Sequence, residues 1–268
     1  MIFADDCCAR PARAGAFQNN GPVRHVDAHA FILGTHRLRE KDRIVSLLTR
    51  ETGRKRGVAR GAASPRSAFS GTLEPMTEAR VLYFEKDAQE LVSIRSIDPI
   101  RSSFPLSRQL ASALLLGAFA ESLQTFVSDS DPAEPFYRLA RHALDGLFAG
   151  AEPGLAAVYF DVWLLKLSGL FPSPGECAGC GRVLDATESV FFDESRPGFV
   201  GPECRAGSAL RVSAAALTAL RGILAAPLDP SAHPAGLSEL AEIARRARRH
   251  FLGHELKSQR VLQEALRN

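Results

Sequence analysis

Apolar and polar residues alternate in the first part of the chain with the period of β-strands. The segment 26–33 places Val26, Ala30 and Ile32 on one face, and Gly34 is expected to end it. Four further segments rich in β-forming residues follow, at residues 44–49, 55–60, 79–84 and 91–95. Five short strands in succession predict a small closed barrel, and an oligonucleotide-binding barrel has five strands.

The rest of the chain has a helical pattern with one interruption. Segments 106–127 and 154–170 are apolar around most of their circumference, which places both inside a bundle. Asp131, followed by proline, indicates the start of a helix that runs to about residue 148. Ser213 is a capping residue for another helix, and a last helical segment follows Gly236.

The predicted fold class is therefore α+β and multidomain. Residues 1–22 have no apolar period and are expected to form a disordered leader. The five-stranded barrel is assigned to residues 23–100, and an all-helical domain is assigned to residues 101–268. A small zinc-ribbon-like insertion interrupts the helical domain at about residues 175–207.

Cysteines define the insertion. Cys177 and Cys180 enclose a glycine-bearing turn on which two thiolates can bind one metal ion, and a predicted hairpin returns the chain to Cys204. A second Cys-x-x-Cys pair would need cysteine at position 201, where this chain has glycine. Two interpretations stay open: a structural zinc ion held by Cys177, Cys180, Cys204 and another group, or a degenerate knuckle that keeps its fold without metal.

Composition indicates a globular protein without a membrane-spanning or secretory segment. The chain has 268 residues, of which 46% are hydrophobic and 24% are charged, values typical of globular domains. Its five cysteines are an odd number, which favours a reducing compartment over a disulfide framework. The apolar runs are too short to span a bilayer, and the first residues lack the apolar core of a secretory signal. We therefore expect a cytoplasmic protein.

Positive charge is concentrated although the net charge is only +3. The glycine-rich stretch 53–75 carries five cations and no acidic residue before Glu74, and the connection between the first two strands adds four more. The predicted phosphate-binding surface consists of Arg37, Arg39, Lys41, Arg43, Arg54, Lys55, Arg56, Arg60 and Arg66. A solvated loop is the alternative. Phe31 and Phe69 are candidates to stack on a base, although barrel core is the commoner role for such residues.

A second basic cluster lies near the C-terminus. Arg245, Arg248 and Arg249 share one helical face by their spacing of three and four residues. This face is either solvated and balanced by nearby glutamates, or it is a docking surface for an acidic peptide or for phosphates.

The sequence lacks the usual motifs of covalent catalysis. It contains no P-loop, no His-Glu-x-x-His and no convincing nucleophile–base pair. A catalytic zinc ion on the three cysteines would need a neighbouring general base, which the sequence does not offer. We therefore do not expect an enzyme.

Several motifs in order carry a resemblance to a known family. They are residues 42–53, residues 57–62 with Pro65 and Phe69, residues 73–75, the Cys177-x-x-Cys180-Gly knuckle with its hairpin, and residues 251–258. With these motifs the chain resembles the RecO family of bacterial recombination mediators in DNA repair. The resemblance runs from about residue 25 to the C-terminus, but glycine at position 201 and the first twenty or so residues depart from it.

The resemblance implies a fold and an activity. Proteins of this family have an oligonucleotide-binding barrel, a helical domain and, in many members, a four-cysteine zinc site. The implied activity is to bind single- and double-stranded DNA, to anneal complementary strands and, with RecR, to help RecA displace single-strand-binding protein, during repair at the bacterial nucleoid. No cofactor is required for it.

Two hypotheses follow from the resemblance. In the first, the nine cations of the barrel bind DNA backbones. In the second, the protein is mainly an adaptor whose helical domain offers an apolar groove, rimmed by Arg245, Arg248 and Arg249, to the acidic C-terminal tail of single-strand-binding protein, while the barrel docks RecR.

Overall fold

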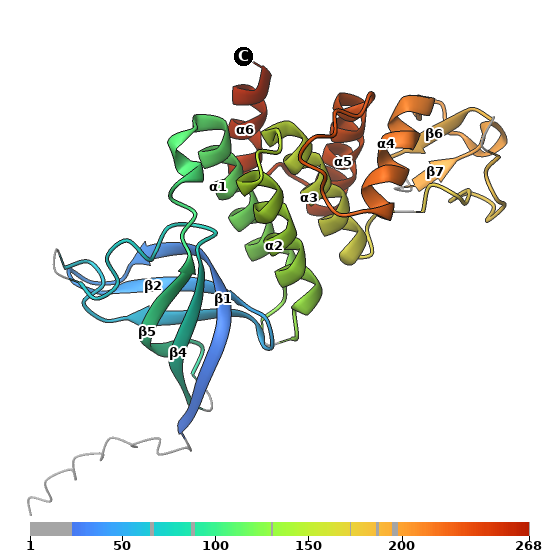
Figure 1. Cartoon of the computed structure of the whole chain (residues 1–268). Helices are drawn as coiled ribbons and strands as arrows, with labels where there is room; N and C mark the ends of the chain where they lie inside the picture. Colours follow the sequence, from blue (N-terminus) through green and yellow to red (C-terminus); the bar gives the residue numbers. More distant parts are fainter. Residues whose placement is uncertain are drawn as a thin grey trace, which may run out of the picture.

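The computed structural model describes residues 23–64, 67–86, 89–129, 131–171, 173–185, 188–194 and 198–267. The predicted leader at residues 1–22 and the predicted contact residue Arg66 lie outside the described residues. Figure 1 shows a barrel and a small three-stranded sheet at opposite ends of the molecule, with helices between them. Nowhere in the described ranges is a helix both long and apolar enough to cross a membrane.

Five strands form the barrel, as the sequence predicts. They are β1 (Val23–Arg37), β2 (Arg43–Thr49), β3 (Gly53–Ala59), β4 (Glu78–Lys86) and β5 (Val92–Arg101). The closed order is β1-β2-β3-β5-β4, and β1 completes the ring by pairing with β4. Only the β3–β5 pairing is parallel; the others are antiparallel. This is the expected oligonucleotide-binding type of barrel.

The first strand is longer than the sequence pattern indicates. Gly34 was expected to end it, and that expectation is wrong because β1 continues to Arg37. The register of β1 against β2 shifts between Ile32 and Gly34, which marks a β-bulge. A bulge bends a strand, and β1 accordingly pairs with β4 through its first half and with β2 through its second half.

Both sides of the barrel wall are buried along part of β1 and β2. Ile32 and Leu47 point into the barrel core, whereas Phe31, Leu33 and Leu48 belong to the core of the helical domain. Successive side chains of a strand point to opposite faces, so one strand serves two cores. The outer barrel face therefore packs directly on the helices.

Helices make up most of the described chain from residue 106 onward, apart from the insertion. They are η1 (Leu106–Arg108), α1 (Leu110–Phe126), α2 (Glu134–Phe148), α3 (Pro153–Leu167), α4 (Ala214–Ala225), α5 (Leu237–Leu252) and α6 (Lys257–Arg267). The segment predicted as one helix from residue 106 is broken at Gln109, whose backbone is extended. Ser213 caps α4 as expected, because its hydroxyl accepts a hydrogen bond from the amide of Ala216 at 3.1 Å.

The bundle core combines aromatic packing with one buried ion pair. The rings of Phe119 and Phe160 stack with their centroids 3.9 Å apart. Nearby, Asp161 of α3 accepts a hydrogen bond of 2.6 Å from Arg248 of α5, and Gln259 of α6 donates to the other carboxylate oxygen at 3.3 Å. Three helices thus share one buried polar contact, which fixes their register.

The insertion forms a three-stranded sheet beside α4. Strands β6 (Val190–Asp193) and β7 (Gly198–Val200) form the predicted hairpin, and β8 (Leu210–Val212) adds a strand that the sequence pattern does not reveal. At three residues β8 is too short to show an alternating pattern. A short 3-10 turn, η2 (Pro202–Cys204), carries the third cysteine.

Candidate nucleic-acid interface and cysteine cluster

The connection between β1 and β2 forms a rigid, exposed turn. The amides of Leu38 and Arg39 both donate to the carbonyl of Asp42, at 3.1 and 3.5 Å. The carboxylate of Asp42 accepts a hydrogen bond of 2.9 Å from the amide of Gly61. The amide of Ala63 donates to the carbonyl of Lys41 at 3.0 Å. These contacts tie the β1–β2 turn to the loop that follows β3.

Four cations lie on these two tied segments, and we call them the basic tip: Arg37, Arg39, Lys41 and Arg60. All four are exposed. None of them forms an ion pair with another residue of the described ranges. Their charge is therefore available to an anion from solution.

Two other predicted contact residues, Arg43 and Arg56, lie on strands β2 and β3. Arg56 of β3 is exposed, and the described part of the chain offers it no ion-pair partner. Arg43 is half-buried and donates a long hydrogen bond of 3.4 Å to the hydroxyl of Thr35. Arg43 therefore lies next to the basic tip in sequence, and its guanidinium is hydrogen-bonded to a side chain of β1.

Two of the predicted contact residues are held in ion pairs. Arg54 donates to Asp129, which follows α1, at 2.6 Å, and also to the carbonyl of Gln124. This hydrogen bond from Arg54 lowers the pKa of Asp129. Lys55 lies 2.7 Å from Glu85 of β4. Arg54 joins the barrel to the helical domain, and Lys55 joins two strands of the barrel.

The two aromatic candidates for base stacking are both core residues. Phe31 is buried against the ring of Tyr137, with 4.8 Å between the centroids. Phe69 is buried in the barrel core. Neither ring is accessible to a base.

The three arginines of α5 do not share one exposed face. Arg248 is only 3% exposed and donates to Asp161 inside the bundle. Arg245 is half-buried and pairs with Glu242 and Glu255. Arg249 alone among the three is exposed, with Glu194 at 3.9 Å. Helical spacing places residues near one another, but it does not say which side of the helix faces the bundle.

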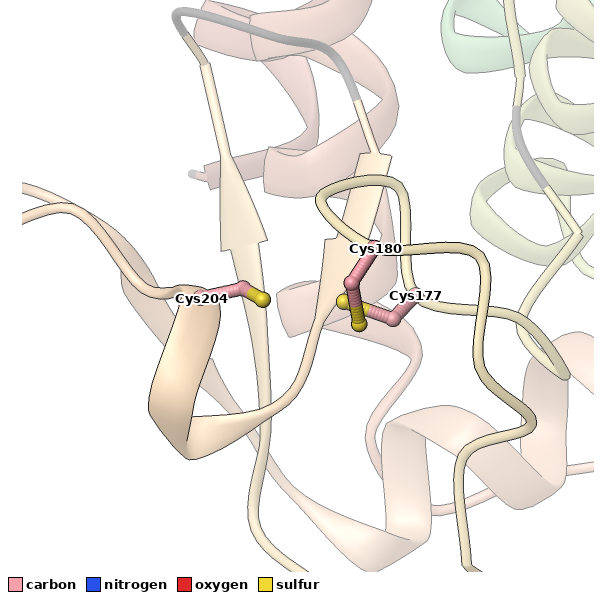
Figure 2. Close-up of side chains that lie close together, drawn as sticks. All are labelled: Cys177, Cys180 and Cys204. Carbon is pink, nitrogen blue, oxygen red and sulfur yellow. The ribbon is translucent and has the colours of Figure 1, made fainter.

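The predicted cysteine cluster is assembled in the structure. The sulfur atoms of Cys177, Cys180 and Cys204 all lie within 4.8 Å of one another, and Figure 2 shows the three thiols together, between the knuckle turn and η2. Cys177 is buried, Cys204 is half-buried and Cys180 is exposed. In the parts of the chain that are described, no histidine or carboxylate joins them. The cluster can supply three ligands to a metal ion.

The thiols differ in acidity. Burial alone would raise the pKa of Cys177, but hydrogen bonds from the backbone of Gly201, Cys180 and Gly179 outweigh it and lower this pKa to about 6. Hydrogen bonds with the other two thiols raise the pKa of Cys204 to about 11. Cys177 therefore ionises before Cys204.

Comparison with known proteins agrees with this architecture. The family model for "Recombination protein O N terminal" matches residues 24–103, and the model for "Recombination protein O C terminal" matches residues 108–260. The "DNA repair protein RecO" of Anaeromyxobacter sp. (strain K) is 33% identical over 232 residues, which cover 84% of this chain and 91% of that protein. The protein of the same name from Koribacter versatilis (strain Ellin345) is 35% identical over 173 residues, 65% of this chain and 70% of that protein.

This chain belongs to the RecO family. The resemblance inferred from its motifs is confirmed, and so is its place among DNA repair and recombination proteins.

This RecO-family chain also has a groove that sequence reasoning missed. It lies between α2, α3 and the C-terminal end of α4 with the residues that follow, and its volume is about 350 Å³. Tyr159 and Trp163 form its apolar wall, and Arg138 and His142 contribute polar atoms. Lys166 lies 5.7 Å from the centre of the Trp163 ring. Trp163 is the only tryptophan in the sequence, but a tryptophan in an apolar helical segment is more typical of core packing than of a binding groove.

Arg54 and Arg56 lie two residues apart on β3, and only Arg54 has an ion pair among the described residues. Replacing each in turn therefore tests whether the ion pair of Arg54 stabilises the fold. Replacing Arg54 by alanine should lower the free energy of unfolding by about 1–2 kcal/mol, because two hydrogen bonds to the helical domain are removed. Arg56→Ala should leave it almost unchanged. Thermal unfolding followed by circular dichroism measures both.

The loss of unfolding free energy caused by Arg54→Ala should also depend on pH. Since Asp129 has a lowered pKa in the folded state, its ion pair stabilises fully above the usual aspartate pKa of about 4 and is lost as pH falls through the lowered value. The gap between wild type and Arg54→Ala should therefore narrow in acid. Equal loss of stability in both variants at neutral pH would contradict the structural role of Arg54.

Proposed function

We propose that this RecO-family protein binds single- and double-stranded DNA by its phosphate backbone, anneals complementary strands and, together with RecR, helps RecA to load onto DNA covered by single-strand-binding protein. The observation that carries this proposal is the basic tip, with four exposed cations on two segments that backbone and Asp42 hydrogen bonds hold together. The activity is binding, without covalent chemistry and without a required cofactor. Its place is the cytoplasm, at the bacterial nucleoid.

Annealing needs a surface of this kind. Two DNA strands repel each other, and cations that neutralise phosphates release counterions and lower this repulsion. Such contacts do not read the base sequence, so any complementary pair can be aligned. The fixed geometry of the basic tip reduces the conformational entropy lost when a strand binds.

The nine predicted contact residues divide into two roles in this proposal. The basic tip with Arg56 makes the main phosphate contacts, and Arg43 and Arg66 add to them. Arg54 and Lys55 contribute positive potential, but their main role is to hold the barrel together and against the helices. The same barrel surface, away from the helices, is also where RecR docks in this proposal.

A triple replacement of the basic tip tests the DNA site. Arg37→Ala with Arg39→Ala and Lys41→Ala should weaken single-strand binding and flatten the log–log dependence of affinity on salt. The slope should change by about 0.7 for each phosphate that is no longer neutralised, or by about 2 for all three. Fluorescence anisotropy with a labelled oligonucleotide at several salt concentrations measures this slope.

A matched control uses cations elsewhere on the molecule. Arg221 of α4 and Arg249 of α5 are exposed arginines on helices, far along the chain from the barrel. Their joint replacement by alanine removes positive charge but should leave the salt slope unchanged. If the triple variant keeps the wild-type slope while the control variant has a flatter one, the DNA site lies on the helical domain.

An adaptor role is the second candidate, and the groove beside Trp163 favours it. An apolar floor with cationic groups at its edge suits a short peptide that is acidic and ends in apolar residues. The acidic C-terminal tail of single-strand-binding protein has this chemistry. In this proposal Arg138, which lines the groove, takes the rim position first considered for Arg245, Arg248 and Arg249, and Lys166 adds positive charge beside Trp163.

Trp163 is the only tryptophan in the chain and can report on this groove. A peptide copy of that acidic tail, titrated into the full chain, should change the fluorescence of Trp163 in a saturable way. Arg138→Glu should weaken binding of the peptide several-fold, because like charges then meet at the rim. Arg249→Glu is the control and should bind as wild type. Weakening by Arg249→Glu alone would move the docking surface to α5.

A further inference from the structure

An arginine guanidinium fills the space that a side chain at position 201 would take. Position 201 is where a complete second Cys-x-x-Cys pair would have its first cysteine. A Cβ atom at Gly201 would lie 3.1 Å from Cζ of Arg182 and closer still to its Nη2, while Leu184 would be 3.4 Å away on another side. A cysteine side chain therefore has no room at position 201 unless the guanidinium moves away.

Arg182 is held in place by an ion pair. Its two terminal nitrogens donate to the two carboxylate oxygens of Glu188, at 2.9 and 2.7 Å. Glu188 is itself fixed, because it also accepts a hydrogen bond of 2.7 Å from the amide of Asp185. A bidentate pair of this kind has a defined geometry and is stronger than a single exposed contact. The guanidinium is thus held over Gly201.

Backbone hydrogen bonds of the chain itself close the knuckle turn. The amide of Cys177 donates to the carbonyl of Arg182 at 2.8 Å, and the amide of Gly181 donates back to the carbonyl of Cys177 at 2.8 Å. Gly181 has a φ of 75°, which glycine adopts without strain. A third bond of 2.8 Å runs from the amide of Ala178 to the carbonyl of Phe199 on β7.

The insertion is also anchored by apolar packing. Leu184, Phe192, Phe199 and Val200 are buried and belong to the same continuous core as the helical bundle. Small zinc domains unfold without metal because they bury too little apolar surface to be stable alone. This insertion is attached to a large core, so that need does not apply here.

We propose that the Arg182–Glu188 ion pair replaces the fourth ligand in this chain, and that the knuckle keeps its fold without a tetrahedral zinc ion. The four-cysteine zinc site implied by the family resemblance does not fit the residues present. Zinc binding is lost, while the turn and the hairpin that such a site would organise are retained. Cys177, Cys180 and Cys204 remain as a cluster of reduced thiols.

Zinc content and chelator sensitivity test this proposal on the full chain. The wild-type protein, expressed with added zinc and dialysed into metal-free buffer with a thiol reductant, should contain far less than one zinc per chain by mass spectrometry. Its unfolding temperature should be the same with and without a chelator. A wild-type protein that keeps one zinc per chain and loses stability with chelator overturns the proposal.

Two variants test the role of Arg182. The double variant Arg182→Ala with Gly201→Cys completes the four-cysteine set and frees its corner, so it should bind one zinc per chain and become sensitive to chelator. Gly201→Cys alone keeps Arg182, whose guanidinium would have to leave its ion pair with Glu188 to make room, so this variant should bind much less zinc. Equal zinc binding by the single and double variants, or none by a folded double variant, overturns the assignment of Arg182. If the double variant does not fold, the zinc content of the wild-type protein decides alone.

Discussion

The contact between the outer face of the barrel and the helical bundle determines how the rest of the molecule is arranged. Three side chains on the outer face of the barrel wall pack into the bundle core: Phe31, Leu33 and Leu48. Beside them, the buried carboxylate of Glu78 accepts hydrogen bonds from the hydroxyl of Tyr137, at 2.7 Å, and from Arg141. A buried carboxylate needs such donors, so this contact tolerates little displacement of α2 against the barrel. The barrel and the bundle therefore form one unit.

This contact also explains how positive charge is distributed. The helices cover the middle of β1 and the adjoining part of β2, and they leave the far end of the β1–β2 hairpin exposed. Cations near the covered part, such as Arg54, form ion pairs with residues of the helical domain. Cations at the open end have no such partner among the described residues, and there the charge can serve a phosphate backbone. The same kind of residue thus has a structural role at one end of the barrel and a proposed binding role at the other.

The sequence pattern predicted the fold class, the five strands and the cysteine cluster, because each depends on local periodicity or on a short motif. It failed where a residue's role is decided by a partner far along the chain. Arg248 looks like a surface cation until Asp161, 87 residues earlier, is placed beside it. Gly34 looks like the end of a strand, but in the barrel β1 continues past it, with a β-bulge between Ile32 and Gly34. The glycine at position 201 was visible in the sequence, whereas the guanidinium above it was not.

DNA binding at the basic tip is tested most directly by hydrogen–deuterium exchange of the full chain with and without single-stranded oligothymidine at low salt. Residues 37–43 and 58–64 should exchange more slowly in the presence of DNA, because a bound strand covers both segments of the tip. Residues 237–252 of α5 should exchange at the same rate in both samples. Protection confined to the helical domain, with the two segments of the tip unchanged, would contradict the proposed DNA site.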